Sequence, residues 1–171
     1  FRSNIYGKTK VEGDHAIEKS GASHLIFRTG WVYSKTGGSF LRTILKLAKE
    51  KNELRVVNDQ TGTPTWCRSI AEATRKIINH ILEKRERSLS ETVSSISGVY
   101  HMTCQGETNW HGFAQTILEL SYPDNMPKLL AISTKEYPTP AIRPTYSVLS
   151  NSKLKKNFGI ELPHWEHALK Q

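Results

Sequence analysis

The sequence has 171 residues, of which 37% are hydrophobic and 23% are charged, and this composition excludes disordered, collagenous and fibrous proteins. Its longest apolar run is the four residues 129–132, so we expect neither a membrane-spanning helix nor a signal peptide. Cys67 and Cys104 have no CxxC partner, which argues against a disulfide scaffold or a cysteine zinc site and favours a reducing, cytoplasmic compartment.

The net charge is +8, from 24 Lys and Arg against 16 Asp and Glu, which would suit an anionic partner such as nucleic acid, a phosphate ester or an acidic membrane. The basic residues are spread along the expected helices and are interleaved with glutamates, as on solvated helix faces. There is no uninterrupted basic stripe and no known reader motif. We therefore expect neither nucleic acid nor a membrane as a partner.

Periodicity and turn signals divide the chain into alternating helices and strands. Helices are expected where apolar residues recur at i, i+3, i+4 and i+7, and strands where short apolar runs follow breakers such as Gly, Ser or Pro. The expected helices cover 3–19, the stripe 41–48 behind Gly37-Gly38-Ser39, 69–81, the segment around 110–118, 152–157 and 164–170. The expected strands are 24–29, 54–57, 99–102 and 128–132. This order predicts an α/β fold with parallel strands.

Local signals predict where some of these elements begin. Ser69 and Glu72 match an S-x-x-E capping box, and Thr108 is the expected cap of the helix that follows it. The Ser-rich stretch 87–97 has no periodicity and is expected to be a mobile connection. Three prolines in 137–144 predict an extended or turn conformation.

Tyr6 and Lys10 stand at i and i+4 of the first expected helix, so their side chains share one face. A tyrosine beside an ammonium can act as a general acid, because the positive charge stabilises the phenolate. The spacing alone is common, and a solvated Tyr and Lys on a surface helix is the alternative.

The residues around this pair carry a resemblance. The run 4–14 (NIYGKTKVEGD), followed by 25–33 (LIFRTGWVY), resembles the extended short-chain dehydrogenase/reductase superfamily, whose catalytic helix has N-x-Y-G-x-[ST]-K before a strand ending in R-T. Within it, the chain is most similar to the dTDP-4-dehydrorhamnose reductase family. Further signatures recur in order: GGSF at 37–40, VNDQTGTPTW at 57–66, GVYH at 98–101, YPTPAIRP at 137–144, SKL at 152–154 and LPHW at 162–165.

The resemblance implies reduction of the C4 keto group of dTDP-4-dehydro-L-rhamnose with NADPH or NADH. Tyr6 would give a proton to the C4 oxygen, and Lys10 would assist Tyr6 and hold the nicotinamide ribose. The Gly-rich dinucleotide fingerprint and the upstream Ser or Thr of the family do not occur. We therefore expect the C-terminal part of a reductase, inactive by itself.

Three further residues are implied in substrate binding. Trp31, which follows the strand, would contact the sugar; a half-buried packing aromatic is the alternative. Arg143 would pair with the substrate diphosphate, or else pin the Pro-rich loop to an acidic neighbour. Thr65 would face the nucleotide, although a loop hydroxyl bonded to nearby backbone is the plainer interpretation.

The resemblance also implies two domains. Residues 1–33 and 67–103 would complete the Rossmann-type nucleotide-binding sheet, and 34–66 with 104–171 would form a smaller α/β substrate-binding domain.

Alternative functions remain, among them another sugar-nucleotide epimerase or dehydratase, or a non-catalytic binding or regulatory subunit of the same fold. His164 and His167 lack a third ligand for a metal site. The sequence settles neither NADPH against NADH, nor a homodimer, nor a divalent ion such as Mg²⁺, which no motif supports.

Overall fold

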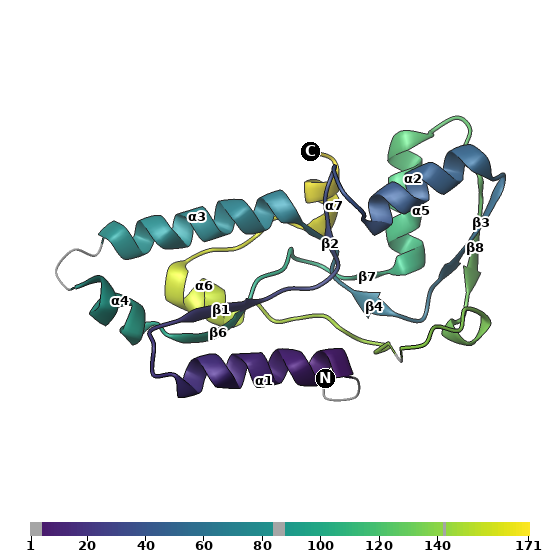
Figure 1. Ribbon diagram of the computed structural model, residues 1–171. Helices are drawn as coiled ribbons and strands as arrows, with labels where there is room; N and C mark the ends of the chain where they lie inside the picture. The colour runs from purple at the N-terminus through teal and green to yellow at the C-terminus, as the bar shows by residue number, and fades with distance from the viewer. Residues whose placement is uncertain (1–4, 84–87, 142) are drawn as a thin grey trace.

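The computed structural model describes residues 5–83, 88–141 and 143–171. Helices and strands are interspersed along the chain, in a mixed α/β arrangement (Figure 1). The elements are α1 (Ile5–Lys19), β1 (Leu25–Arg28), β2 (Val32–Tyr33), α2 (Phe40–Glu50), β3 (Glu53–Val57), β4 (Thr61–Gly62), β5 (Thr65–Trp66), α3 (Cys67–Glu83), α4 (Leu89–Ser95), β6 (Gly98–His101), β7 (Thr108–Asn109), α5 (Trp110–Ser121), β8 (Lys128–Ile132), the 3₁₀ helix η1 (Thr134–Glu136), α6 (Ser152–Phe158) and α7 (Trp165–Leu169). The expected helix at 3–19 is confirmed from Ile5 onward, and residues 3 and 4 lie outside the described residues.

One end of the molecule is built on the parallel pair β1–β6, in which Leu25 pairs with Gly98 and Arg28 with His101. Figure 1 shows α1 on one side of this pair and α3 on the other. Parallel strands require a long connection between them, and here residues 29–97 supply it, including α2 and β3 of the other end of the molecule as well as α3 beside this pair.

The other end is built on the parallel pair β3–β8, in register from Glu53 opposite Lys128 to Val57 opposite Ile132. Helices α2 and α5 pack against each other and lie beside this pair in Figure 1. Between the two ends, β2 pairs with β5 in parallel and β4 with β7 in antiparallel orientation. The expected parallel α/β fold is confirmed, with this one antiparallel pair among the described strands.

The core joins both ends. Phe113, Ala114 and Leu118 of α5 are fully buried, as are Met102 after β6 and Leu154 of α6. These side chains belong to one continuous hydrophobic cluster. Burial of this apolar area is the main stabilising contribution to the fold.

Two predicted helix starts are wrong. Ser69 lies inside α3, which begins at Cys67, so it does not cap the helix, and Glu72 instead accepts from Arg68 Nε at 2.8 Å. The cap of α5 is Asn109, one residue beyond Thr108, and its side chain accepts from the Gly112 N–H at 2.8 Å. Asparagine is the better cap of the two.

The expected mobile connection at 87–97 is also wrong in its described part. Residues Leu89–Ser95 form α4, and Ser88 and Glu91 make a reciprocal capping box. Glu91 accepts from the Ser88 backbone N–H at 2.9 Å, so two otherwise unpaired donors are satisfied. Residue 87 lies outside the described residues.

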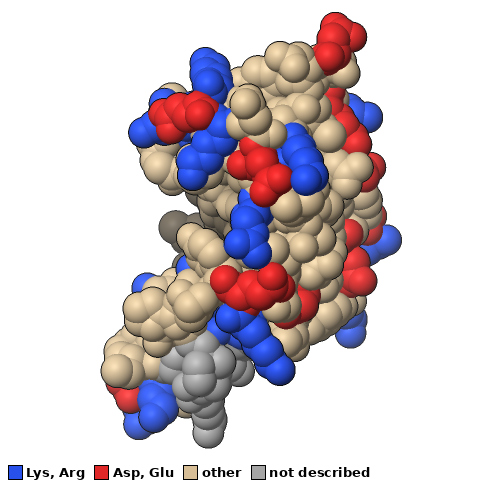
Figure 2. Space-filling view, turned by 90° about the vertical axis from the view of Figure 1, so that its right-hand side faces the viewer, with Lys and Arg blue, Asp and Glu red and all other residues tan. Residues whose placement is uncertain are grey.

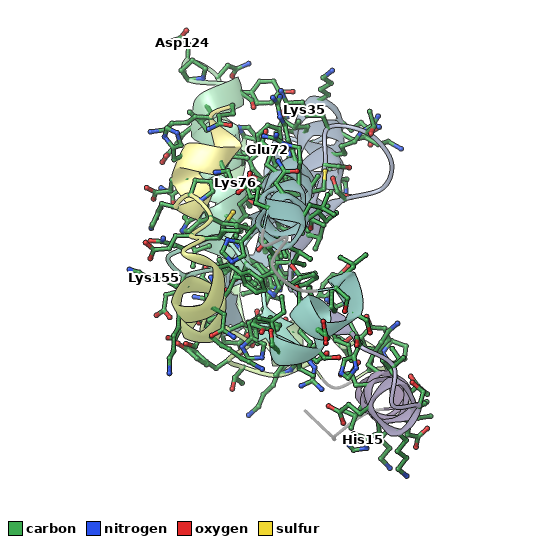
Figure 3. The ribbon with its side chains drawn as sticks, turned by 90° about the vertical axis from the view of Figure 1, so that its left-hand side faces the viewer. His15, Lys35, Glu72, Lys76, Asp124 and Lys155 are labelled. Carbon is green, nitrogen blue, oxygen red and sulfur yellow. The ribbon has the colours of Figure 1, made fainter. Side chains whose placement is uncertain are left out.

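Helix α1 stands apart from the rest of the structure. None of its described side chains is buried. Figure 3 shows α1, marked by His15, separated from the helices that carry Glu72, Lys76 and Lys155. A side-chain bond connects it to β1: Arg28 Nε donates to the Asp14 carboxylate at 2.9 Å.

The surface at the β3–β8 end carries mixed charge. Figure 2 shows Lys and Arg interspersed with Asp and Glu on this face. Two pairs there are Lys128 with Glu53 at 3.1 Å and Arg55 with Glu136 at 3.3 Å. Among the helices that the structure describes, none has the length and apolar character needed to cross a membrane.

Candidate functional site

Tyr6 and Lys10 lie one helical turn apart on α1. The Lys10 Nζ is 5.4 Å from the centroid of the Tyr6 ring, close enough for the ammonium to interact with the aromatic face. Tyr6 is 73% exposed and Lys10 is also exposed, so both groups are accessible to a ligand. The phenol of Tyr6 and the ammonium of Lys10 therefore lie on one exposed face of α1, and no side chain among the described residues is hydrogen-bonded to the phenol.

Trp31 follows the end of β1 and is partly buried. Its backbone has φ of 48°, the left-handed region that non-glycine residues rarely adopt. Its carbonyl accepts from the Thr65 N–H at 3.1 Å, which fixes the turn against β5.

The Trp31 indole stacks on Trp110, the first residue of α5. The ring centroids are 3.6 Å apart and the planes differ by 7°. Gly62 lies against the same Trp31 ring, because a Cβ built there would meet Nε1 at 2.6 Å and Cζ2 at 2.7 Å. One face of Trp31 is thus covered by Trp110, and a sugar cannot stack on that face.

Trp110 is held by a hydrogen-bonded chain of side chains. Its Nε1–H donates to Gln60 Oε1 at 3.2 Å, and Gln60 Nε2 donates to Thr134 Oγ1 at 2.9 Å. The Thr134 hydroxyl and backbone N–H in turn donate to Asp59. The hydrogen bond from the hydroxyl and, to a smaller extent, the one from the backbone N–H hold the pKa of Asp59 below its ordinary value.

A pocket of about 630 Å³ lies between α2, β3 and the segment that follows η1. Its lining includes Phe40, Gln60, Trp110, Tyr137 and Arg143. This volume falls within the range of small-molecule sites, about 300–1,000 Å³. Neither Tyr6 nor Lys10 lines it. The structure therefore joins Trp31, through Trp110, to the pocket that Arg143 borders, and leaves the Tyr6–Lys10 pair on a separate element.

The charges around the pocket favour an anionic ligand. Glu53 pairs with Lys128 and Glu136 with Arg55, so the two acids of the lining are already compensated. Hydrogen bonds from the Ser133 backbone and hydroxyl, with the nearby Arg55 charge, hold the pKa of Glu136 below its ordinary value. Lys51 and Arg143 also line the pocket, and neither has a carboxylate partner among the residues the structure describes. The acidic neighbour that would pin the loop through Arg143 is not found there.

Thr65 requires a correction. Its side chain is 0% exposed, its hydroxyl donates to the Thr63 carbonyl at 3.1 Å and accepts from the Cys104 N–H at 3.3 Å. Both functions of the hydroxyl are used inside the protein, so Thr65 does not face a nucleotide. Thr65 connects the loop at 63–65 to the chain beyond β6. This agrees with the plainer interpretation, a loop hydroxyl bonded to nearby backbone.

Gln60 and Trp110 were not singled out by the sequence as site residues. Trp110 was expected only on the apolar side of its helix, and Gln60 only in a loop. They are identified by hydrogen bonds between residues far apart in the sequence. Gln60 and Trp110 are 50 positions apart, and Gln60 and Thr134 are 74 positions apart. No spacing rule within one element reports such contacts.

No metal centre is formed by the described residues, because they contain no group of three or more His, Cys, Asp and Glu that could hold an ion. His164 instead caps α7, with Nδ1 accepting from the Glu166 N–H at 3.4 Å. Tyr6 and Lys10 are exposed and offer a phenol and an ammonium for hydrogen bonds to a ligand. The sequence contains no glycine-rich turn for the phosphates.

Comparison with known proteins then places the chain. A family model described as the RmlD substrate binding domain matches residues 3–171. The chain belongs to this family. It is 45% identical to the dTDP-4-dehydrorhamnose reductase of Burkholderia thailandensis over 97% of this chain and 56% of the relative. It is 40% identical to the enzyme of the same name from Escherichia coli K12, over 98% of this chain and 54% of the relative.

Solved structures agree with this assignment. A dTDP-4-dehydrorhamnose reductase from Clostridium acetobutylicum matches with a TM-score of 0.83 at 36% identity, covering 98% of this chain and 54% of that one. The reductase from Bacillus anthracis, solved in complex with NADP, matches with a TM-score of 0.80 at 32% identity, covering 98% and 53%. The present chain thus spans about half the length of the relatives it matches.

Proposed function

We propose that this chain is the substrate-binding, C-terminal part of a reductase that converts dTDP-4-dehydro-L-rhamnose to dTDP-L-rhamnose with NADPH or NADH. The observation that carries the proposal is the accessible Tyr6–Lys10 pair, with 5.4 Å between the Lys10 Nζ and the Tyr6 ring, in a chain of the RmlD substrate binding domain family. The relatives named as this reductase match along nearly the whole chain, which supports the substrate assignment.

The proposed chemistry adds one hydride and one proton across the C4 carbonyl. The nicotinamide cofactor, when bound, supplies the hydride. Tyr6 gives its phenolic proton to the C4 oxygen, so that the developing alkoxide becomes a hydroxyl. Lys10 stabilises the negative charge that Tyr6 acquires and donates hydrogen bonds to the nicotinamide ribose. Solvent returns the proton to Tyr6, which is open to water.

The pocket beside α2 and β3 is the proposed nucleotide end of the site. Arg143 donates to the diphosphate through its planar guanidinium, and Lys51 adds a second positive charge. Trp31 marks the sugar end. Because Trp110 covers one face of its ring and Gly62 lies against the atoms Nε1 and Cζ2, Trp31 contacts the sugar through the ring surface that remains.

The proposed domain division assigns residues 1–33 and 67–103 to the nucleotide-binding domain, and 34–66 with 104–171 to the substrate-binding domain. The pair β1–β6 falls wholly in the first and β3–β8 wholly in the second, which supports the division. The pair β2–β5 crosses it and connects the two.

A homodimer in the cytoplasm is the proposed state of the protein.

Product analysis tests the proposal. The protein that carries this chain together with a cofactor-binding half is incubated with dTDP-4-dehydro-L-rhamnose and NADPH or NADH, and the products are identified by NMR. A reductase forms one dTDP-L-rhamnose for each cofactor oxidised. An epimerase or dehydratase changes the sugar without net cofactor oxidation, and a binding subunit leaves the sugar unchanged; any of these results would contradict the proposal.

A further inference from the structure

Gln60 is a buried amide between β3 and β4. It is 7% exposed, and both ends of its amide are hydrogen-bonded, to Trp110 at 3.2 Å and to Thr134 at 2.9 Å. Buried polar groups cost free energy unless they are satisfied, so such a residue is retained where its bonds matter. The proposed reaction as described above does not use it.

The direction of this hydrogen-bond chain is fixed by chemistry. An indole N–H is a donor only, so the Gln60 oxygen must face Trp110 and its NH₂ must face Thr134. The Thr134 oxygen then accepts from Gln60, and its own proton goes to the Asp59 carboxylate, which is an acceptor only. The chain therefore has one arrangement, anchored by a negative charge at one end and by an indole at the other.

Trp110, at one end of this series of hydrogen bonds, sets the plane of the Trp31 indole. Trp110 and Trp31 are stacked with 3.6 Å between centroids and 7° between planes, and Phe40 packs on Trp110 at 4.6 Å. Trp110 thus lies between Phe40, Gln60 and Trp31, which leaves it little freedom to tilt. Trp31 has no hydrogen bond of its own Nε1–H to a described residue, so stacking on Trp110 and contact with Gly62 fix its ring.

We propose that Gln60 and Trp110 are positioning residues: Gln60 orients the Trp110 indole, and Trp110 holds Trp31 in the plane in which it meets the sugar. This rests on the proposed function, in which Trp31 contacts the sugar of the substrate. Because Gln60 also bonds Thr134 of η1, just before the segment that carries Arg143, one side chain holds the walls at both the sugar end and the diphosphate end.

Steady-state kinetics of the complete protein test the proposal. Trp110→Ala removes the stacking partner and is expected to raise the KM for the sugar nucleotide by about 3- to 10-fold, with the KM for the cofactor changed less than about twofold. Trp110→Phe keeps an aromatic ring but loses the N–H, and Gln60→Leu loses the acceptor. Each should give a smaller rise in the same KM. The double variant Trp110→Phe/Gln60→Leu should raise this KM no more than the stronger of the two single variants does, because each single variant already removes the bond between Trp110 and Gln60.

Indole N–H signals in NMR report the geometry directly. The protein has four tryptophans, and substitution of each by Phe assigns them in this chain. The Trp110 N–H, bonded to Gln60, should exchange slowly with solvent. In Gln60→Leu this protection should fall, and the Trp31 signal, shifted by the ring current of Trp110, should move. Trp165→Phe is the matched control, since Trp165 packs in the core on Phe113 and not in the stack.

The outcomes separate this proposal from the proposed function. If Trp31→Ala raises the KM for the sugar while folded Trp110→Ala and Gln60→Leu leave it unchanged, the positioning role is wrong and the reductase assignment stands. An unmoved Trp31 signal in Gln60→Leu also overturns the positioning role. If the wild type reduces no dTDP-sugar, the proposed function fails, and the sugar contact on which this inference rests fails with it.

Discussion

Arg28, at the end of β1, donates from Nε to the Asp14 carboxylate of α1 at 2.9 Å. Asp14 is 14% exposed and Arg28 44% exposed, so water screens this pair only in part. Because no side chain of α1 is buried in the described residues, the bond is a main anchor of the helix that carries Tyr6 and Lys10.

We therefore expect Arg28→Met to loosen α1. The expected loss is about 1 kcal/mol of local stability, which hydrogen exchange of the α1 amides measures as faster exchange confined to that helix. Arg68→Met is the matched control, because the Arg68–Glu72 pair lies within α3 and is exposed. Equal exchange of α1 in Arg28→Met and the wild type would show that the pair does not anchor the helix.

Gly62→Ala should disturb the tryptophan stack. A Cβ at Gly62 would overlap the Trp31 ring, so either the indole or the β4 backbone must move, at a cost of about 1–3 kcal/mol. Thermal unfolding measures this loss, and the Trp31 indole signal in NMR should move. Gly38→Ala, where a Cβ meets nothing within 4 Å, should leave both unchanged. A Gly62→Ala variant as stable as Gly38→Ala would contradict the packing described here.

Asp59 should make stability depend on acidic pH. Bonds from Thr134 hold its folded-state pKa below the ordinary 3.8, so the ionised carboxylate stabilises the fold above about pH 3.8, and this contribution is lost as the pH falls through the lower folded value. Asp59→Asn should lower the melting temperature near pH 7, and the decrease should become smaller as the pH falls below 3.8. Asp124→Asn, at an exposed loop, is the control. A decrease that stays the same as the pH falls would argue against this linkage.

Arg143 should contribute to nucleotide affinity and little to folding. Its guanidinium has no carboxylate partner among the described residues and lines the pocket, so Arg143→Met should weaken dTDP-sugar binding roughly 10- to 100-fold in calorimetry on the complete protein. Lys76→Met, an exposed charge on α3, should have no such effect (Figure 3). Should Arg143→Met instead lower the melting temperature and bind the nucleotide normally, the residue stabilises its loop.

Strong local patterns predicted much of the fold. The strand Lys128–Ile132 and the helix with the stripe 41–48 are where the apolar spacing indicates, because each is determined by residues close in sequence. The helix starts at Ser69 and Thr108 were wrong because a neighbouring group competed: Arg68 bonded Glu72, and Asn109 supplied a better cap. In the Ser-rich stretch, Ser88 and Glu91 form a capping box that the absence of apolar periodicity concealed.

The site was predicted less completely than the fold. The motif around Tyr6 and Lys10 is local, so the sequence indicates it directly. The roles of Thr65 and Gln60 depend on partners 39 to 74 residues away, which no local pattern reports. For Trp31, the sequence indicates an aromatic at the end of a strand, and the fold adds the stack on Trp110 that restricts which part of the ring a ligand can meet.

Substitution of the proposed proton donor tests the central claim most directly. In the complete protein, Tyr6→Phe removes one hydroxyl from an exposed side chain, so folding and substrate affinity should be nearly unchanged while turnover falls about 100- to 10,000-fold. The measurement is kcat for oxidation of NADPH by dTDP-4-dehydro-L-rhamnose, with the Kd of the dTDP-sugar determined in parallel. A Tyr6→Phe protein that turns over as fast as the wild type would contradict the assignment of Tyr6 as the acid.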